Sequence, residues 1–152
     1  MSIMITIILF NKIKEIIFMS LSIDHIVLTV NDINQSVNFY SNILGMELKE
    51  FYSEFDQTFR KSLIFGYQKI NLHDASNPYK PHAKYPSPGG FDICFLSQKP
   101  VSEWLIILKK NKINIEDGPV KKTGATGPIL SIYVRDPDEN LIEISNLLMN
   151  NN

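Results

Sequence analysis

The stretch Asp24–Asp32 reads DHIVLTVND and sets the pattern for the fold. Its centre is rich in β-branched residues, which is typical of a strand, and it ends in residues that favour a turn and cap a helix. Residues 33–44 then place apolar side chains at helical spacing, and Gly45 follows where helices commonly end. The sequence therefore predicts a strand, an N-cap at Asp32 and an amphipathic helix.

Three more strands are expected after this helix, which completes a β-α-β-β-β order. They cover residues 46–55, 60–65 and 68–73, and a tight turn at Gly66-Tyr67 joins the last two. Residues 74–90 contain four prolines and two glycines without periodicity, so they are expected to form a linker.

The same order of elements recurs after the linker. It comprises a strand at 91–96, a helix at 100–111, strands at 113–120 and 129–134, a turn at 136–140 and a strand at 141–145. Such a duplication predicts an α+β fold of two βαβββ modules, with mixed sheets curved around a central metal or ligand cleft and the helices outside. We expect a single domain over residues 21–152, with module one at 21–74, a linker at 75–89 and module two at 90–146.

Composition narrows the function classes. The 152 residues are 44% apolar, and a chain of this length buries enough surface to fold without disulfides. Fifteen basic and sixteen acidic residues give a net charge of −1, so nucleic acid is not expected as a partner. The single cysteine, Cys94, cannot form an intramolecular disulfide, which favours a reducing, cytoplasmic location.

The first twenty residues differ from the rest of the chain. Ile3–Phe10 is apolar apart from Thr6, but it is shorter than the roughly 20 residues that a membrane span needs. It also lacks the charged start and the cleavage site of a signal peptide. Three interpretations stay open: a translation-start artefact or species-specific tail, an extra packed helix, and a targeting segment. No membrane span is expected.

Polar residues occupy matching places in the two copies. Superposing them puts His25 over Asp92 in the opening strands and Asn71 over Glu143 in the closing strands, with His73 two residues further along the same face. Imidazole and carboxylate together suit a divalent ion such as Mn, Fe, Ni, Co or Zn. The repeat therefore predicts a metal site from His25, Glu143, His73 and Asp92.

Each of these residues also has a structural interpretation. A lone histidine in a strand is more often hydrogen-bonded than a ligand, Glu143 suits the solvent side of an alternating strand, and Asp92 suits a turn after Gly90. The coincidence at equivalent positions favours the metal hypothesis. His73 has two open roles, as a third ligand or as a catalytic base.

These motifs resemble the vicinal oxygen chelate superfamily, which includes glyoxalase I, bleomycin-resistance proteins, fosfomycin-resistance enzymes and extradiol dioxygenases. The stretch Asp24–Asp32, with Phe39-Tyr40 and Leu44-Gly45, looks like its first module, and Tyr133–Glu143 resembles its aromatic-DPDGN-Glu signature. A closer likeness, to the glyoxalase-domain-containing protein 5 group, is carried by Gln68–His73, Phe91–Phe95, Gly118–Val120 and Thr123–Ala125.

The resemblance implies a divalent metal between the modules, with His25 and Glu143 at ligand positions. This sequence departs from glyoxalase I at Asn71, which replaces a glutamate, and at Asp92, which replaces a histidine. Glu139 stands where the signature has a turn glycine, so we expect backbone strain there.

Two functions follow from the resemblance. The first is a small metal-dependent enzyme, of the lyase, isomerase or dioxygenase type, acting on a small molecule with vicinal oxygens. Tyr133 and Arg60 are its expected substrate-binding residues, and a homodimer is its expected assembly. The second is a metal-free protein that sequesters a ligand, in which Tyr67, Phe91, Trp104 and Tyr133 form an aromatic lining.

Overall fold

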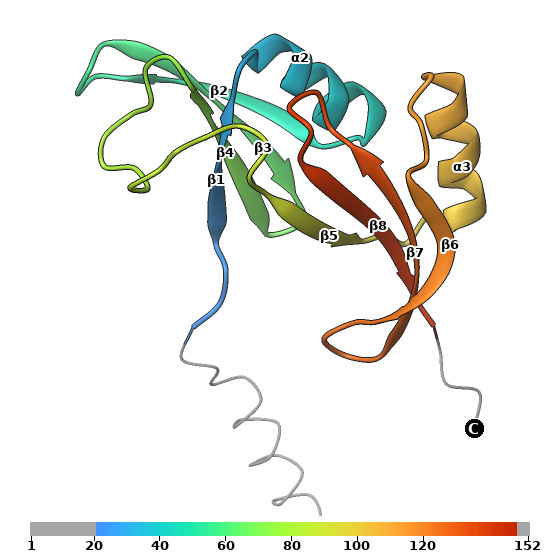
Figure 1. Ribbon diagram of the computed structural model, residues 1–152. Coiled ribbons are helices and arrows are strands. Elements are labelled where there is room, and N and C mark those ends of the chain that lie inside the picture. The colour runs from blue at the N-terminus through green and yellow to red at the C-terminus, as the bar shows by residue number, and fades with distance from the viewer. Residues whose placement is uncertain (1–20, 149–152) are drawn as a thin grey trace, which may run out of the picture.

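The computed structural model describes residues 21–148, so the interpretations of the first twenty residues lie outside the described part of the chain. Two four-stranded sheets form the body of the protein (Figure 1). The first module contains β1 (His25–Val30), α2 (Ile33–Val37), η1 (Asn38–Ile43), β2 (Glu47–Ser53), β3 (Thr58–Phe65) and β4 (Gln68–Asp74). The second contains β5 (Asp92–Leu96), α3 (Val101–Lys110), β6 (Asp117–Thr123), β7 (Pro128–Arg135) and β8 (Leu141–Leu147).

Both sheets have the same topology, which confirms the duplicated βαβββ fold. The strand orders are β1-β4-β3-β2 and β5-β8-β7-β6, and in each sheet the first strand runs parallel to the last. His25 pairs with Lys69, and Asp92 pairs with Leu141. Asn71 lies two residues after Lys69, and Glu143 lies two residues after Leu141. The two residues therefore hold equivalent positions in the two sheets, as the sequence superposition predicts.

The first helix begins as the sequence predicts and ends differently. The Asp32 carboxylate accepts hydrogen bonds from the backbone N–H groups of Asn34 at 2.8 Å and Gln35 at 3.1 Å, which caps α2. The second half, η1, is a π-helical segment in which the Leu44 N–H donates to the Phe39 carbonyl at 3.0 Å. Gly45 follows with φ of 83°, a conformation that glycine adopts without strain.

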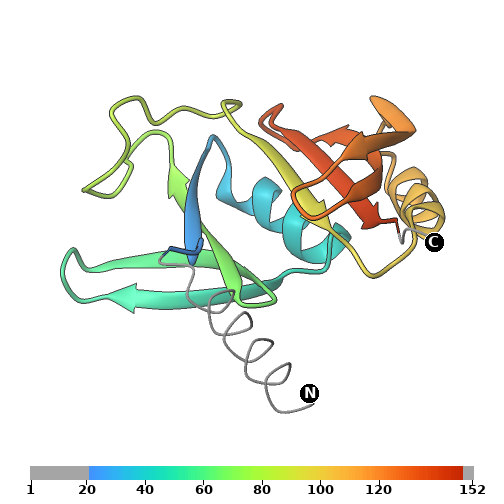
Figure 2. The same ribbon diagram turned by 90° about the horizontal axis from the view of Figure 1, so that it is seen from below.

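Hydrogen bonds and aromatic contacts join the two modules. The Tyr40 hydroxyl donates to Asp136 at 2.7 Å, and the Asn31 side-chain amide donates to Asp138 at 2.8 Å. The rings of Phe65 and Phe95 meet edge to face, 5.3 Å apart. Both views place α2 and η1 between the sheets (Figures 1 and 2), and a single apolar core runs through both modules. The two modules of the described chain therefore share one apolar core.

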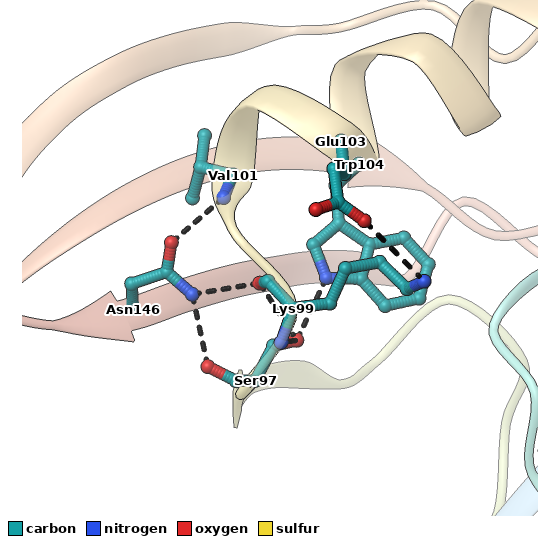
Figure 3. Close-up of polar contacts among 6 residues, drawn as sticks. All are labelled: Ser97, Lys99, Val101, Glu103, Trp104 and Asn146. Atoms are coloured by element: carbon teal, nitrogen blue, oxygen red, sulfur yellow. Dashed lines mark hydrogen bonds and ion pairs between the residues drawn. The ribbon is translucent and has the colours of Figure 1, made fainter.

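Helix α3 is fixed to β8 by one amide side chain (Figure 3). Asn146 accepts from the Val101 N–H at 2.7 Å and donates to the carbonyls of Ser97 at 2.9 Å and Lys99 at 2.8 Å. The Trp104 indole N–H donates to the Ser97 hydroxyl at 2.8 Å. Asn146 thus takes the place of a side-chain N-cap, because Pro100 at the cap position offers none.

Two details differ from or refine the sequence predictions. The strand expected at 113–120 is paired only over Asp117–Thr123, because Ile113 and Ile115 pack against the core first and the register shifts between Asp117 and Val120. Glu139 has φ of 67°, which agrees with the expected strain in its turn. Within residues 21–148, no helix is long and apolar enough to cross a membrane.

Candidate functional site

Strand alternation separates a core face from a polar face in the first sheet. Leu28, Ile70 and Leu72 are fully buried in the apolar core. His25, Asn71 and His73 alternate with them, so these three side chains occupy the opposite face. His73 therefore lies on the same face as Asn71, away from the apolar core.

Glu143 is the centre of a corresponding polar face on the second sheet. It is paired with Cys94 on β5 and with Tyr133 on β7. One Glu143 oxygen accepts a hydrogen bond from the Ser145 hydroxyl at 3.2 Å. The Ser145 hydroxyl also lies 2.8 Å from the Ser131 hydroxyl, so a short hydroxyl chain orients the carboxylate.

A cavity of about 510 Å³ opens in front of Glu143. Tyr133, Cys94, Lys122 and the loop 123–126 complete its wall. Burial and the neighbouring Glu143 carboxylate raise the pKa of Tyr133 to about 12, and burial also raises the pKa of the Cys94 thiol. Both groups are therefore neutral at pH 7, and the carboxylate is the anionic group of this wall.

The Glu143 carboxylate is not ion-paired within the part of the chain that the structure describes. A half-buried carboxylate is normally paired with a cation, hydrogen-bonded or bound to a metal. Within residues 21–148, Glu143 accepts from the Ser145 hydroxyl and interacts with the Tyr133 hydroxyl and the Cys94 thiol, so its charge is hydrogen-bonded but not paired with a cation.

His25 lies at the edge of the first sheet with one ring nitrogen engaged. Its Nδ1 lies 2.7 Å from the Asp24 carboxylate, and this hydrogen bond lowers the pKa of Asp24. A carboxylate on one nitrogen fixes the tautomer and leaves Nε2 to bind a metal, which is the usual arrangement of a histidine ligand. The donor chemistry of His25 and Glu143 therefore fits a divalent transition metal.

A second cavity, of about 350 Å³, lies where the two modules meet. Ile26, Lys69 and Phe95 line it, together with Cys94 and Leu96, which also line the Glu143 cavity. The two cavities therefore adjoin along β5, at the junction where the duplication predicts a cleft.

The predicted ligands do not gather into one cluster. Asp92 lies on the same face as Glu143, as its diagonal neighbour. Within residues 21–148, however, no three His, Cys, Asp or Glu side chains form a group able to hold a metal ion. The proximity of His25 and Glu143 stays a prediction.

His73 is held away from His25. It pairs with Thr29 and lies four residues along β4 from Lys69, the partner of His25, which is about 13 Å at strand rise. Its ring meets the Tyr79 ring edge to face at 5.0 Å. His73, Tyr79 and Arg60 line a small cavity on the first sheet. Tyr133 lines the Glu143 cavity, so the two predicted substrate-binding residues, Arg60 and Tyr133, lie in different cavities.

Two residues beside Glu143 were not predicted as site residues from the sequence. Cys94 and Ser145 each lie two residues beyond a predicted site residue, so strand alternation alone would have found both. The aromatic residues predicted to line a ligand site are dispersed. Tyr67 is fully exposed, Phe91 packs on the core, and Trp104 lines an apolar cavity of about 270 Å³ that shares Phe65, Phe95 and Leu96 with the cavity between the modules.

Comparison with known proteins identifies the family. The model of the glyoxalase/bleomycin resistance protein/dioxygenase superfamily matches residues 22–144, and the chain belongs to this family. It is 48% identical over 123 residues to the virulence protein STM3117 of Salmonella typhimurium, covering 81% of this chain and 82% of that protein. The crystal structure of that protein matches with a TM-score of 0.77, over 84% of this chain and 97% of that chain.

Two further relatives share the domain. The chain is 46% identical over 124 residues to the glyoxalase domain-containing protein RDO1 of Mycosarcoma maydis, covering 82% of this chain and 67% of that protein. It is 29% identical over 124 residues to the metallothiol transferase FosB of Staphylococcus saprophyticus, covering 81% of this chain and 75% of that protein.

Proposed function

We propose that this protein is a small metal-dependent enzyme acting on a small molecule with vicinal oxygens, by lyase, isomerase or dioxygenase-like chemistry. The observation that carries the proposal is the Glu143 carboxylate, which faces a cavity of about 510 Å³ without a cationic partner in the described chain. The distant similarity to FosB, which is named a metallothiol transferase, supports a metal.

His25 and Glu143 would hold the ion, with Asp92 as a further donor on the Glu143 face. Bound there, an ion such as Mn, Fe, Ni, Co or Zn would act as a Lewis acid toward negative charge on the substrate oxygens. Asp24 fixes the His25 ring, and Ser145 orients the Glu143 carboxylate. The neutral Tyr133 hydroxyl would donate to a substrate oxygen, and Lys122, 5.6 Å above the Tyr133 ring, would attract an anionic substrate.

We propose that His73 plays neither of the two roles predicted for it. A ligand or a base has to reach the atoms at the metal, and His73 lies about 13 Å along the strands from the position beside His25. The proposal therefore leaves His73 outside the reacting centre.

A homodimer would complete the metal site. Since the described chain does not group three ligands, we propose that His25 of one subunit meets Glu143 of the partner subunit. We also expect the enzyme to work in the cytoplasm, where its lone Cys94 stays reduced.

Elemental analysis of the purified full-length protein tests the proposal. We expect about one bound transition metal per site in the wild type, and loss of metal in His25→Ala and in Glu143→Gln. His82→Ala is the matched control, because His82 is an exposed linker histidine whose Nδ1 lies 2.8 Å from the Ala83 carbonyl. Unchanged metal content in both site variants would refute this function.

A metal-free, ligand-sequestering protein is the second candidate. It is favoured by the lack of a three-ligand group within residues 21–148 and by the two adjoining cavities at the junction. Under this alternative, a ligand would bind equally well after extensive dialysis against a chelator. Binding that depends on added metal would exclude it.

A further inference from the structure

A small polar pocket lies on the first sheet, under the linker that follows β4. Asn71 pairs with Ser62, so Arg60 on β3 lies opposite His73 on β4, on the same face of the sheet. Tyr79 covers these side chains and encloses a cavity of about 40 Å³. The pocket is separate from the Glu143 cavity.

Three polar atoms of this pocket are buried and have no hydrogen-bond partner within residues 21–148. They are Nε of Arg60, Oδ1 of Asn71 and Nδ1 of His73. The His73 residue is only 8% exposed. Buried polar groups are normally hydrogen-bonded, and three unpaired ones around one cavity indicate a bound polar group.

The walls of the pocket are held in place. The Arg60 guanidinium is ion-paired with Asp56 through Nη2 and lies 4.2 Å from the centre of the Tyr79 ring. The Tyr79 hydroxyl donates to the Phe59 carbonyl at 3.2 Å. Asp56 therefore occupies one end of the guanidinium, while Nε is buried and has no partner among the described residues. A site fixed in this way binds without ordering its own side chains.

The three side chains offer a matching set of donors. Arg60 supplies an Nε–H, and neutral His73 supplies an Nδ1–H in one of its two tautomers. Neither end of the Asn71 amide bonds to a described residue, so a half-turn about its last bond presents the NH₂ group. Three donors around one cavity suit an oxyanion.

Size and charge narrow the ligand to a carboxylate. One water needs about 10–15 Å³ of such a cavity, so about 40 Å³ accommodates roughly three non-hydrogen atoms. Two basic side chains, Arg60 and Lys61, and no acidic one are among the described residues that line the cavity, which favours an anion.

We propose that the pocket formed by Arg60, Asn71 and His73 binds the carboxylate group of a small molecule. Carboxylate binding here does not require the metal centre proposed above, because none of its three donors belongs to that centre.

Acetate and acetamide form a matched pair of probes, equal in shape and different in charge. Each is titrated into the ¹⁵N-labelled full chain, after treatment with a chelator, while the NMR signals of Arg60 Nε–H and the Asn71 side-chain amide are followed. We expect sodium acetate to shift both signals in a saturable way. Acetamide and sodium chloride should give no saturable shift of either signal.

Variants then assign the site. Asn71→Leu keeps the size of the side chain and removes a donor, so we expect acetate to bind at least tenfold more weakly. Should this variant fail to fold, Arg60→Lys replaces it, with Arg135→Lys on the other sheet as the matched control. His25→Ala should bind acetate normally whether or not a metal site exists. The proposal is overturned if acetate gives no saturable shift, if acetamide binds equally well, or if both pocket variants bind like wild type.

Discussion

The Tyr40 hydroxyl donates a hydrogen bond of 2.7 Å to Asp136, which lies 96 positions away in the sequence. Tyr40 belongs to η1 in the first module, and Asp136 to the turn before β8 in the second. The same carboxylate accepts from the backbone of Asp138 and Asn140, each at 2.9 Å. This buried carboxylate therefore ties the closing turn of one module to the helix of the other.

Replacing Tyr40 by phenylalanine tests this junction. Tyr40→Phe removes one donor from a buried carboxylate while keeping the ring, so we expect the free energy of unfolding to fall by about 1.5–3 kcal/mol. Urea denaturation measures the change, and Tyr85→Phe, at an exposed linker tyrosine, is the control with no expected effect. A loss below about 0.5 kcal/mol would show that the bond does not stabilise the junction.

The burial of His73 predicts how stability depends on pH. Burial, then Arg60, then His82 lower the pKa of His73 below its usual 6.5, while the Asp56 carboxylate is ion-paired with Arg60 and the Tyr79 ring lies edge to face against His73. The unfolded chain therefore takes up a proton at His73 more readily than the folded one. The contribution of His73 to the free energy of unfolding is therefore fully present above pH 6.5. It is lost as the pH falls from 6.5 through the lower pKa that His73 has in the folded protein.

Urea denaturation at pH 7.5 and pH 5.5 measures this dependence. We expect His73→Gln to lose less stability than the wild type between the two pH values. His82→Gln removes only the smallest of the three causes, so we expect its pH dependence to lie much closer to that of the wild type than to that of His73→Gln. An equal pH dependence in His73→Gln and the wild type would contradict the prediction.

Asn146 should be needed for the anchoring of α3. Asn146→Ala removes three hydrogen bonds to Val101, Ser97 and Lys99, and leaves partly buried backbone groups unpaired. We expect a loss of about 1–3 kcal/mol, followed by the fluorescence of Trp104, the single tryptophan, during urea denaturation. Asn111→Ala removes one exposed bond and should cost much less.

Mixing two variants tests whether the metal site spans two subunits. When His25→Ala and Glu143→Gln chains are co-refolded, half of the dimers contain one of each, and each such dimer regains one intact site. We therefore expect about a quarter of the wild-type metal content in the mixture and none in either variant alone. No recovery in the mixture, with metal bound by the wild type, would place the site within one chain.

The sequence by itself determined the duplicated architecture. Alternation of apolar residues, the cap at Asp32, the glycine at position 45 and the proline-rich linker are local signals, and each acts within a few residues of its position. They suffice to place both modules and to superpose Asn71 on Glu143. Strand alternation also predicts the face on which His73 lies.

Tertiary structure alone decided which of these residues meet. Pairing His25 with Lys69 and Thr29 with His73 separates the two histidines along the sheet, although both lie on one face. The fold of the linker brings Tyr79 over Arg60 and His73. The linker sequence has no periodicity from which this contact could be predicted. The physical reason is that register and loop packing depend on contacts between residues distant in sequence, whereas helix caps and strand alternation depend on neighbours.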